Sequence, residues 1–318
     1  MKISPLLFFA LTTTSALTLA ACSMVAPLAA PNGPNAPNLS RPNSAGGSSP
    51  AKATSTGLLF VANGRSSVVE IYDKRSPNAL VGQITDGIVG PNGMAVDAAG
   101  NLFVANVDNQ TVTEYAPGSV HPSKTYTMGF HRRLTNPLNV TVGSDGTLYL
   151  VNYIGNGSEV LEYPRHSMTP TIDIAINGGA EGLALDENNS LYVSINFAAG
   201  GRILKFAPGS TTGTDLGISL GFAGGLAFDG GGRLVACDQT TPAIDIFPAG
   251  ATKPSKVITQ ALMDPYHIAF GQHFDRLYLA DSVSDDVVVY SYPSGAIIDK
   301  IHRQFTAYGV AVNPAAPL

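Results

Sequence analysis

A segment of 42 to 46 residues recurs along this chain, and this repeat constrains the fold more than any other feature of the sequence. Residues 91–118, PNGMAVDAAGNLFVANVDNQTVTEYAPG, hold one copy. The copy has an apolar run, a turn from Asp97 to Gly100, a second apolar run, a polar loop, and a third run that ends on Tyr115. Short apolar runs separated by Gly, Asn and Asp predict antiparallel strands joined by hairpins.

The copies can be aligned on the residue that ends the first strand. Asp97 and its equivalents are separated by 46, 43, 43, 42 and 42 residues, and the equivalents are Gly143, Asp186, Asp229, Gly271 and Asn313. This places first strands at 93–97, 139–143, 182–186, 225–229, 267–271 and 309–313, and second strands at 59–63, 102–106, 148–152, 191–195, 234–238 and 277–281. A period of about 40 to 50 residues in an all-β pattern is typical of a propeller.

The two ends of the repeat array are complementary. The array opens with a second strand at Leu59 and closes with an unpaired first strand at 308–312. That last strand would lie innermost in a blade whose other three strands come from 58–85, which would remove two exposed sheet edges. A linear solenoid would need polar caps, and the sequence offers none. We therefore expect residues 57–318 to form a closed six-bladed β-propeller of four-stranded blades, all-β in class, and to be monomeric.

The amino terminus has the features of an export signal. Residues 1–21 contain Lys2, an apolar stretch from 6 to 20, and the sequence Leu-Ala-Ala before Cys22, which resembles a bacterial lipobox. We expect a lipoprotein signal peptide over 1–21 and a lipidated Cys22. An ordinary signal peptide with a chance cysteine, or an amino-terminal membrane anchor, are the alternatives.

Residues 22–56 are rich in Pro, Asn, Ser, Ala and Gly, and contain almost no large apolar residues. This composition predicts a disordered tether after the lipidated cysteine. Ser23, rather than Asp, follows Cys22, which resembles the outer-membrane sorting pattern. We expect a lipid-anchored protein of the cell envelope, in the outer membrane and facing the periplasm or the surface.

Composition excludes some classes of protein. The net charge is −5, and the 18 Lys and Arg residues form no basic run, so we expect no nucleic-acid partner. Cys237 is the only cysteine besides Cys22, so a disulfide framework is not expected. Cys237 lies in an apolar run, which favours a buried structural residue over a nucleophile.

Several motifs resemble a known group of proteins. PNGMAVD, GNLFVAN, EGLALD and PYHIAF followed by DRLYLAD resemble the NHL-repeat six-bladed propellers and their relatives, the gluconolactonase and regucalcin-like hydrolases. The chain has no Trp, so the WD-repeat signature is absent. The resemblance to the hydrolases implies a divalent cation over the central channel. We expect no cofactor, and calcium is the alternative that this resemblance implies. At the equivalent positions, Asn92 and Glu181 match the ligand pattern, whereas Leu138, Gly224, Tyr266 and Tyr308 do not.

Two rings of residues are expected on one face of the disc, because the first strand starts where the antiparallel second strand ends. From these rings the candidate binding residues are Asn92, Asn106, Asn152, Glu181, Tyr266, His267 and Tyr308. Asn106 and Asn152 belong to the outer ring, where Asn and Asp can instead satisfy loop backbone groups as Asx turns. His267 resembles the histidine base of streptogramin lyases, but the rest of that constellation is missing, so no catalytic residue is assigned.

These observations favour a membrane-tethered propeller that acts as a binding or docking platform for protein or saccharide. The alternative, which rests on the resemblance, is a metal-dependent lactonase or esterase of the gluconolactonase type.

Overall fold

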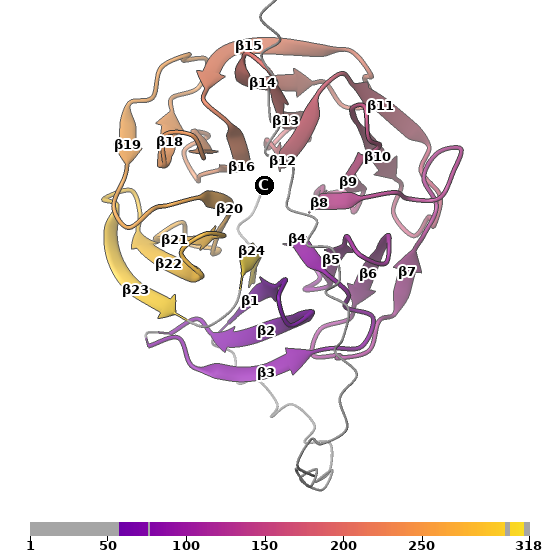
Figure 1. Ribbon diagram of the computed structural model, residues 1–318, viewed down its shortest axis with the longest axis horizontal. Coiled ribbons are helices and arrows are strands. Elements are labelled where there is room, and N and C mark those ends of the chain that lie inside the picture. Colours follow the sequence, from indigo (N-terminus) through magenta and orange to yellow (C-terminus); the bar gives the residue numbers. More distant parts are fainter. Residues whose placement is uncertain (1–56, 76, 303–305, 315–318) are drawn as a thin grey trace, which may run out of the picture. The chain divides into compact units, whose positions relative to one another are not determined.

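The computed structural model describes residues 57–75, 77–302 and 306–314, and every structural statement below concerns these residues. They form six antiparallel four-stranded sheets arranged in a ring around a central channel (Figure 1). The predicted six-bladed β-propeller is thereby confirmed. The predicted signal peptide, Cys22 and the tether over 22–56 lie outside the described residues. None of the described residues belongs to a helix long and apolar enough to cross a membrane.

Each blade uses four strands, named here from the inner strand outwards. The first three blades are β24 (Ala307–Asn313), β1 (Leu58–Asn63), β2 (Val68–Asp73) and β3 (Leu80–Ile84); β4 (Pro91–Val96), β5 (Leu102–Asn106), β6 (Thr111–Tyr115) and β7 (Lys124–Tyr126); and β8 (Pro137–Val142), β9 (Leu148–Tyr153), β10 (Ser158–Tyr163) and β11 (Ile172–Ile176). The other three are β12 (Gly179–Leu185), β13 (Leu191–Phe197), β14 (Gly200–Phe206) and β15 (Gly213–Leu220); β16 (Ala223–Phe228), β17 (Leu234–Asp238), β18 (Ala243–Phe247) and β19 (Lys256–Ile258); and β20 (Pro265–Phe270), β21 (Arg276–Asp281), β22 (Asp286–Ser291) and β23 (Ala296–His302).

The ring closes as the sequence predicts. β24 pairs with β1 in antiparallel register, with Val310 opposite Val61 and Val312 opposite Leu59. The inner strands contact one another in the order β24, β4, β8, β12, β16, β20, and β20 returns to β24. The carboxy-terminal strand therefore completes the blade that the amino-terminal strands begin.

Apolar side chains between neighbouring blades form the core. The aromatic residue at or near the end of each third strand is buried there, and three of the tyrosines among them also donate a hydrogen bond to the preceding blade. The hydroxyl of Tyr115 donates to the carbonyl oxygen of Asp86 at 2.6 Å, and that of Tyr163 donates to Met128 at 2.7 Å. Each acceptor lies just after the outer strand of the preceding blade, so these tyrosines fasten one blade to the next.

The outer strands vary in length, since β7 and β19 have three residues each and β15 extends over eight. The first strands begin earlier than expected, at Pro91 rather than Gly93 in the blade of β4. Cys237 is fully buried and unpaired, as expected, and burial raises the pKa of its thiol.

Candidate functional site at the channel mouth

The two faces of the disc are built from different loops. The inner strands start, and the second strands end, on one face, which we call the mouth face; it carries the loops that link second to third strands and fourth to first strands. The remaining turns lie on the opposite face. The predicted convergence of the two rings on one face is therefore a property of the structure.

A β-bulge near the start of each inner strand shapes the channel. The pairing register shifts between Pro91 and Met94 in β4, and between Pro137 and Asn139 in β8. Equivalent shifts occur in β12, β16 and β20, and in β1 opposite β24. A bulge re-aims side chains locally. As a result, two consecutive residues of these strands reach into the channel and form two layers.

The upper layer is organised by Tyr266. Its hydroxyl accepts a hydrogen bond from Asn92 Nδ2 at 3.3 Å and donates to Glu181 Oε2 at 3.5 Å. These residues stand on β4, β12 and β20, which alternate around the ring, so Tyr266 spans the mouth. The ring of Tyr308 packs against that of Tyr266, with centroids 5.5 Å apart. Four predicted site residues are thus brought together.

Glu181 is the only charged residue on the six inner strands, so these strands hold no Lys or Arg that could pair with it. Burial raises the pKa of its carboxyl to about 7; the hydrogen bond from Tyr266 opposes this shift, and the negative charge of Asp264 adds to it. Glu181 as a whole residue is half-buried. Among the described residues it makes no ion pair.

The lower layer is a hydrogen bond across the channel. His267 on β20 and Asn139 on β8 stand on opposite blades, and His267 Nε2 lies 3.2 Å from Asn139 Oδ1. The backbone N–H of Val310 donates to His267 Nδ1 at 3.5 Å, so Nε2 carries the proton and donates to Asn139. Burial lowers the pKa of His267 to about 4, which keeps the ring neutral. We call this pair the crossbar.

Glycine fills the other four positions of the lower layer because the backbones approach closely there. These positions are Gly93, Gly182, Gly225 and Gly309. A Cβ atom on Gly309 would lie 2.1 Å from the carbonyl oxygen of Asn92, and one on Gly93 would lie 2.4 Å from Asn139 Oδ1. Beyond the crossbar is a cavity of about 140 Å³ lined by His267 and by the middle residues of the inner strands. The crossbar therefore separates the mouth from this cavity.

Asn106 and Asn152, the two candidates from the outer ring, are fully buried. Asn106 Oδ1 accepts from the backbone N–H of Val89 at 3.2 Å, and Asn152 Oδ1 accepts from the N–H groups of Thr135 and Asn136 at 3.0 and 2.9 Å. The structure thus shows the loop-bracing role that was the alternative for this ring. A direct role for these two residues in ligand binding stays a prediction.

The mouth does not match the ligand set of a calcium ion. Calcium takes six to eight oxygen ligands. The side chains that converge here offer oxygens from Asn92, Glu181 and Tyr266, and the Tyr266 hydroxyl already joins the other two. Within the described residues no group of three or more His, Cys, Asp or Glu side chains could hold a metal ion. We therefore derive no chemistry through a metal.

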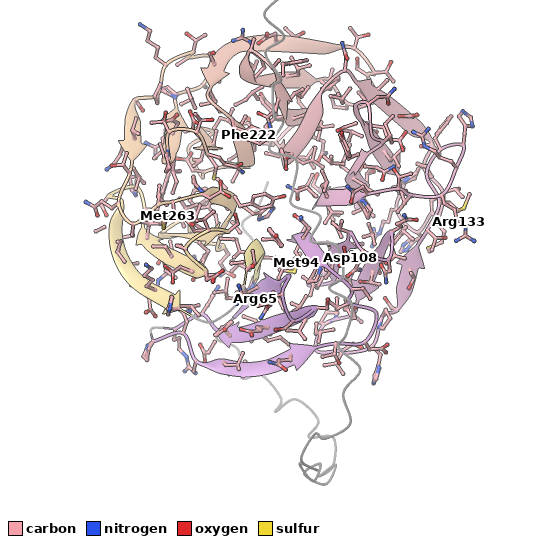
Figure 2. The ribbon with its side chains drawn as sticks, in the orientation of Figure 1. Arg65, Met94, Asp108, Arg133, Phe222 and Met263 are labelled. Carbon is pink, nitrogen blue, oxygen red and sulfur yellow. The ribbon has the colours of Figure 1, made fainter. Side chains whose placement is uncertain are left out.

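The mouth face also carries exposed apolar side chains, which the sequence-based reasoning missed. Five large ones surround the mouth and define what we call the mouth patch: Val89, Phe197, Phe222, Met263 and Val283, with exposed fractions of 39, 44, 37, 58 and 59%. In Figure 2, Phe222 lies near the top of the ring, between β15 and β16, and Met263 lies at the left, between β19 and β20. Among the described residues, the loops of the opposite face carry one such side chain, Met168, and the outer strands carry five more: Leu80, Val81, Val257, Ile297 and Ile298. The sequence offered a signal for two of these residues, because Phe222 and Met263 are apolar residues within the loop segments GFAGG and ALMDP.

Comparisons with known proteins bear on the fold. No protein-family model matches the chain, and no curated protein matches it. A chain from the crystal structure of the nidogen/laminin complex is 18% identical, with a TM-score of 0.63 over 80% of this chain and 97% of its own length. A protein of unknown function from Bacteroides caccae is 12% identical, with a TM-score of 0.62 over 81% of this chain and 99% of its own. Hydrazine synthase from Kuenenia stuttgartiensis gives 14% identity and a TM-score of 0.57, covering 80% and 86%.

At these identities the similarity establishes the propeller fold alone. The narrower resemblance to the NHL-repeat and gluconolactonase group stays a prediction.

Proposed function

We propose that this propeller is a membrane-tethered docking platform whose mouth face binds a protein partner. The observation that carries the proposal is the unequal distribution of exposed apolar side chains, which gather around the mouth and are almost absent from the opposite face. Exposed apolar side chains that gather on one face favour an interaction site there. The buried centres of protein interfaces are rich in Phe and Met, and the mouth patch contains two Phe and one Met.

The geometry of the mouth favours a surface interaction over passage through the channel. The crossbar spans the channel below the mouth, and Tyr266 spans it above. What remains for a partner is the surface of the mouth face itself. One structural neighbour belongs to the nidogen/laminin complex, so a propeller of similar architecture occurs in a protein assembly. That likeness supports a protein partner over a saccharide.

The docking function is tested by changing the two faces separately. We expect peptides selected from a random phage-displayed library against the protein to lose binding at least tenfold when Phe222 and Met263 are both changed to Asp, because two charges would enter the apolar centre of the interface. Met168→Asp, the matched change on the opposite face, should leave binding unaltered. The measurement is the Kd of selected peptides by isothermal titration calorimetry.

Selected peptides that bind the double variant as well as the wild-type protein would contradict a docking role for the mouth face. A saccharide that binds while no peptide depends on the mouth patch would contradict the choice of partner class.

The position of Gly57 is consistent with tethering. Gly57 precedes β1, which starts on the face opposite the mouth, and its carbonyl oxygen accepts from the N–H of Lys74 at 3.4 Å. A flexible coil of 34 residues, from Ser23 to Thr56, has an r.m.s. span on the order of 30 Å.

Lipidation at Cys22 can be measured directly. We expect Cys22→Ser to abolish incorporation of an alkyne-labelled palmitate and to move the protein from the membrane fraction to the soluble fraction, because acylation requires the thiol and stable anchoring requires two acyl chains. Cys237→Ser is the matched control and should keep both the label and the membrane association. Membrane association of the Cys22→Ser protein without label would indicate the alternative, an amino-terminal membrane anchor.

A further inference from the structure

We infer that the partner inserts the side chain of a lysine or arginine into the channel mouth, where the cationic group pairs with the carboxylate of Glu181. This inference rests on the docking function proposed above and specifies the chemistry of the partner. Three properties of the mouth support this inference: its charge, its packing and its polar groups.

The carboxylate of Glu181 lacks the counter-ion that several other buried carboxylates have. Glu114 pairs with Lys124 at 2.8 Å, and Glu159 pairs with Arg132 at 2.7 Å. Glu181, in contrast, has a tyrosine hydroxyl at 3.5 Å and forms no ion pair among the described residues. Burying a charge without a partner is unfavourable, and a cation brought by a binding partner would relieve that penalty.

The walls of the mouth suit a cation on an apolar stem. The rings of Tyr266 and Tyr308 pack together with centroids 5.5 Å apart at 60°, and the Tyr266 hydroxyl lies 3.5 Å from Glu181 Oε2. A lysine or arginine head group is attracted to tyrosine ring faces, and its methylene stem packs on apolar surface. Phe222 and Met263 supply such surface around the mouth. A long side chain can therefore pass the mouth patch and place its charge near Glu181.

No described cation competes for this position. The inner strands contain no Lys or Arg, and His267 in the crossbar is neutral. Arg65, on a loop of the mouth face, lies 4.0 Å from Asp285. Asp264, on the loop before β20, adds negative potential near Glu181. The field at the mouth thus favours a positively charged group over a neutral or negative one.

A second polar group at the mouth also lacks a partner. Gly224 occupies the upper-layer position on β16, and a Cβ atom there would lie 2.9 Å from Gln239 Nε2. This Nε2 atom is buried and has no hydrogen-bond partner among the described residues. Because Nε2 is a donor, a carbonyl oxygen of the inserted segment would satisfy it after a side-chain shift that exposes this atom. Glu181 remains the group on which the inference rests.

The test uses the same random peptide library and adds a double-mutant cycle. We expect the selected peptides that depend on the mouth patch to share a Lys or Arg flanked by apolar residues. Replacing that Lys by norleucine, or that Arg by citrulline, should weaken binding to the wild-type protein at least tenfold. The same replacement should change binding to the Glu181→Gln protein less than twofold, because the charge partner is gone. Kd values come from isothermal titration calorimetry, and thermal unfolding confirms that Glu181→Gln is folded.

The outcomes separate the inference from the function on which it rests. Peptides that depend on the mouth patch, but share no basic residue or show no coupling to Glu181, would overturn the inference and leave the docking function intact. Coupling between a basic residue and Glu181 supports both. If no selected peptide depends on the mouth patch, both fail.

Discussion

Val310→Asp is expected to abolish the cooperative folding of the propeller. Val310 is fully buried on β24, opposite Val61 of β1, in the seam that closes the ring. A carboxylate buried there would destabilise the fold by at least about 4 kcal/mol. Domain stabilities are about 5–15 kcal/mol, so a large share of the stability would be lost. Differential scanning calorimetry should show no transition, or one lowered by at least about 10 °C.

Ile298→Asp is the matched control for this prediction. Ile298 is 37% exposed on β23, the outer strand of the neighbouring blade, so the new charge would remain in water. We expect its melting temperature to lie within about 2 °C of the wild type. A Val310→Asp protein that unfolds at the wild-type temperature would contradict the closure of the ring by β24.

The second large effect concerns the crossbar and is expected to depend on pH. Burial lowers the pKa of His267 from 6.5 to about 4 in the folded protein. Between these values the unfolded chain binds more protons than the folded chain, so stability falls as the pH falls. The full penalty, reached near pH 4, is about 3 kcal/mol. At pH 8 His267 is neutral in both states and the penalty is absent.

The pH effect is isolated by comparing variants. His267→Gln can keep a donor toward Asn139 but does not titrate, so the difference in free energy of unfolding between wild type and variant should shift by about 3 kcal/mol in favour of the variant from pH 8 to pH 4. Urea titrations across this range provide the measurement. His131→Gln, at an exposed position, is the control and should show no such shift. A difference that does not vary with pH would mean that His267 is not buried in the channel.

The fold could be predicted because propeller repeats are local in sequence. The apolar runs and turns of residues 91–118 define strands within one blade, and the period of the copies gives the number of blades. The array begins with a second strand at Leu59 and ends with a first strand, and this offset predicts that the last strand closes the ring. The copies are separated by nearly equal numbers of residues, so equivalent positions in different blades could be aligned from the sequence. The aligned residues Asn92, Glu181, Tyr266 and Tyr308 do converge on the mouth.

The packing inside the channel could not be predicted in the same way. The crossbar joins residues 128 positions apart on opposite blades, and the bulge that aims consecutive residues at the axis leaves no signature in hydrophobic periodicity. For Asn106 and Asn152, sequence alone could not choose between ligand contact and loop bracing, because an Asn that follows a strand suits both. The mouth patch was missed because an apolar residue in a loop reveals its exposure only in three dimensions.

The central claim, that the mouth face is the docking surface, is tested most directly in intact cells. A photo-crosslinking amino acid is placed singly at Phe222, Met263, Met168 and Ile298 of the full-length protein, and irradiation is followed by detection of the protein on denaturing gels. We expect Phe222 and Met263 to give a discrete crosslinked species containing a second protein, and Met168 and Ile298 to give none. Crosslinks confined to Met168 or Ile298, or none at the two mouth positions when all four proteins are folded and membrane-associated, would contradict the account.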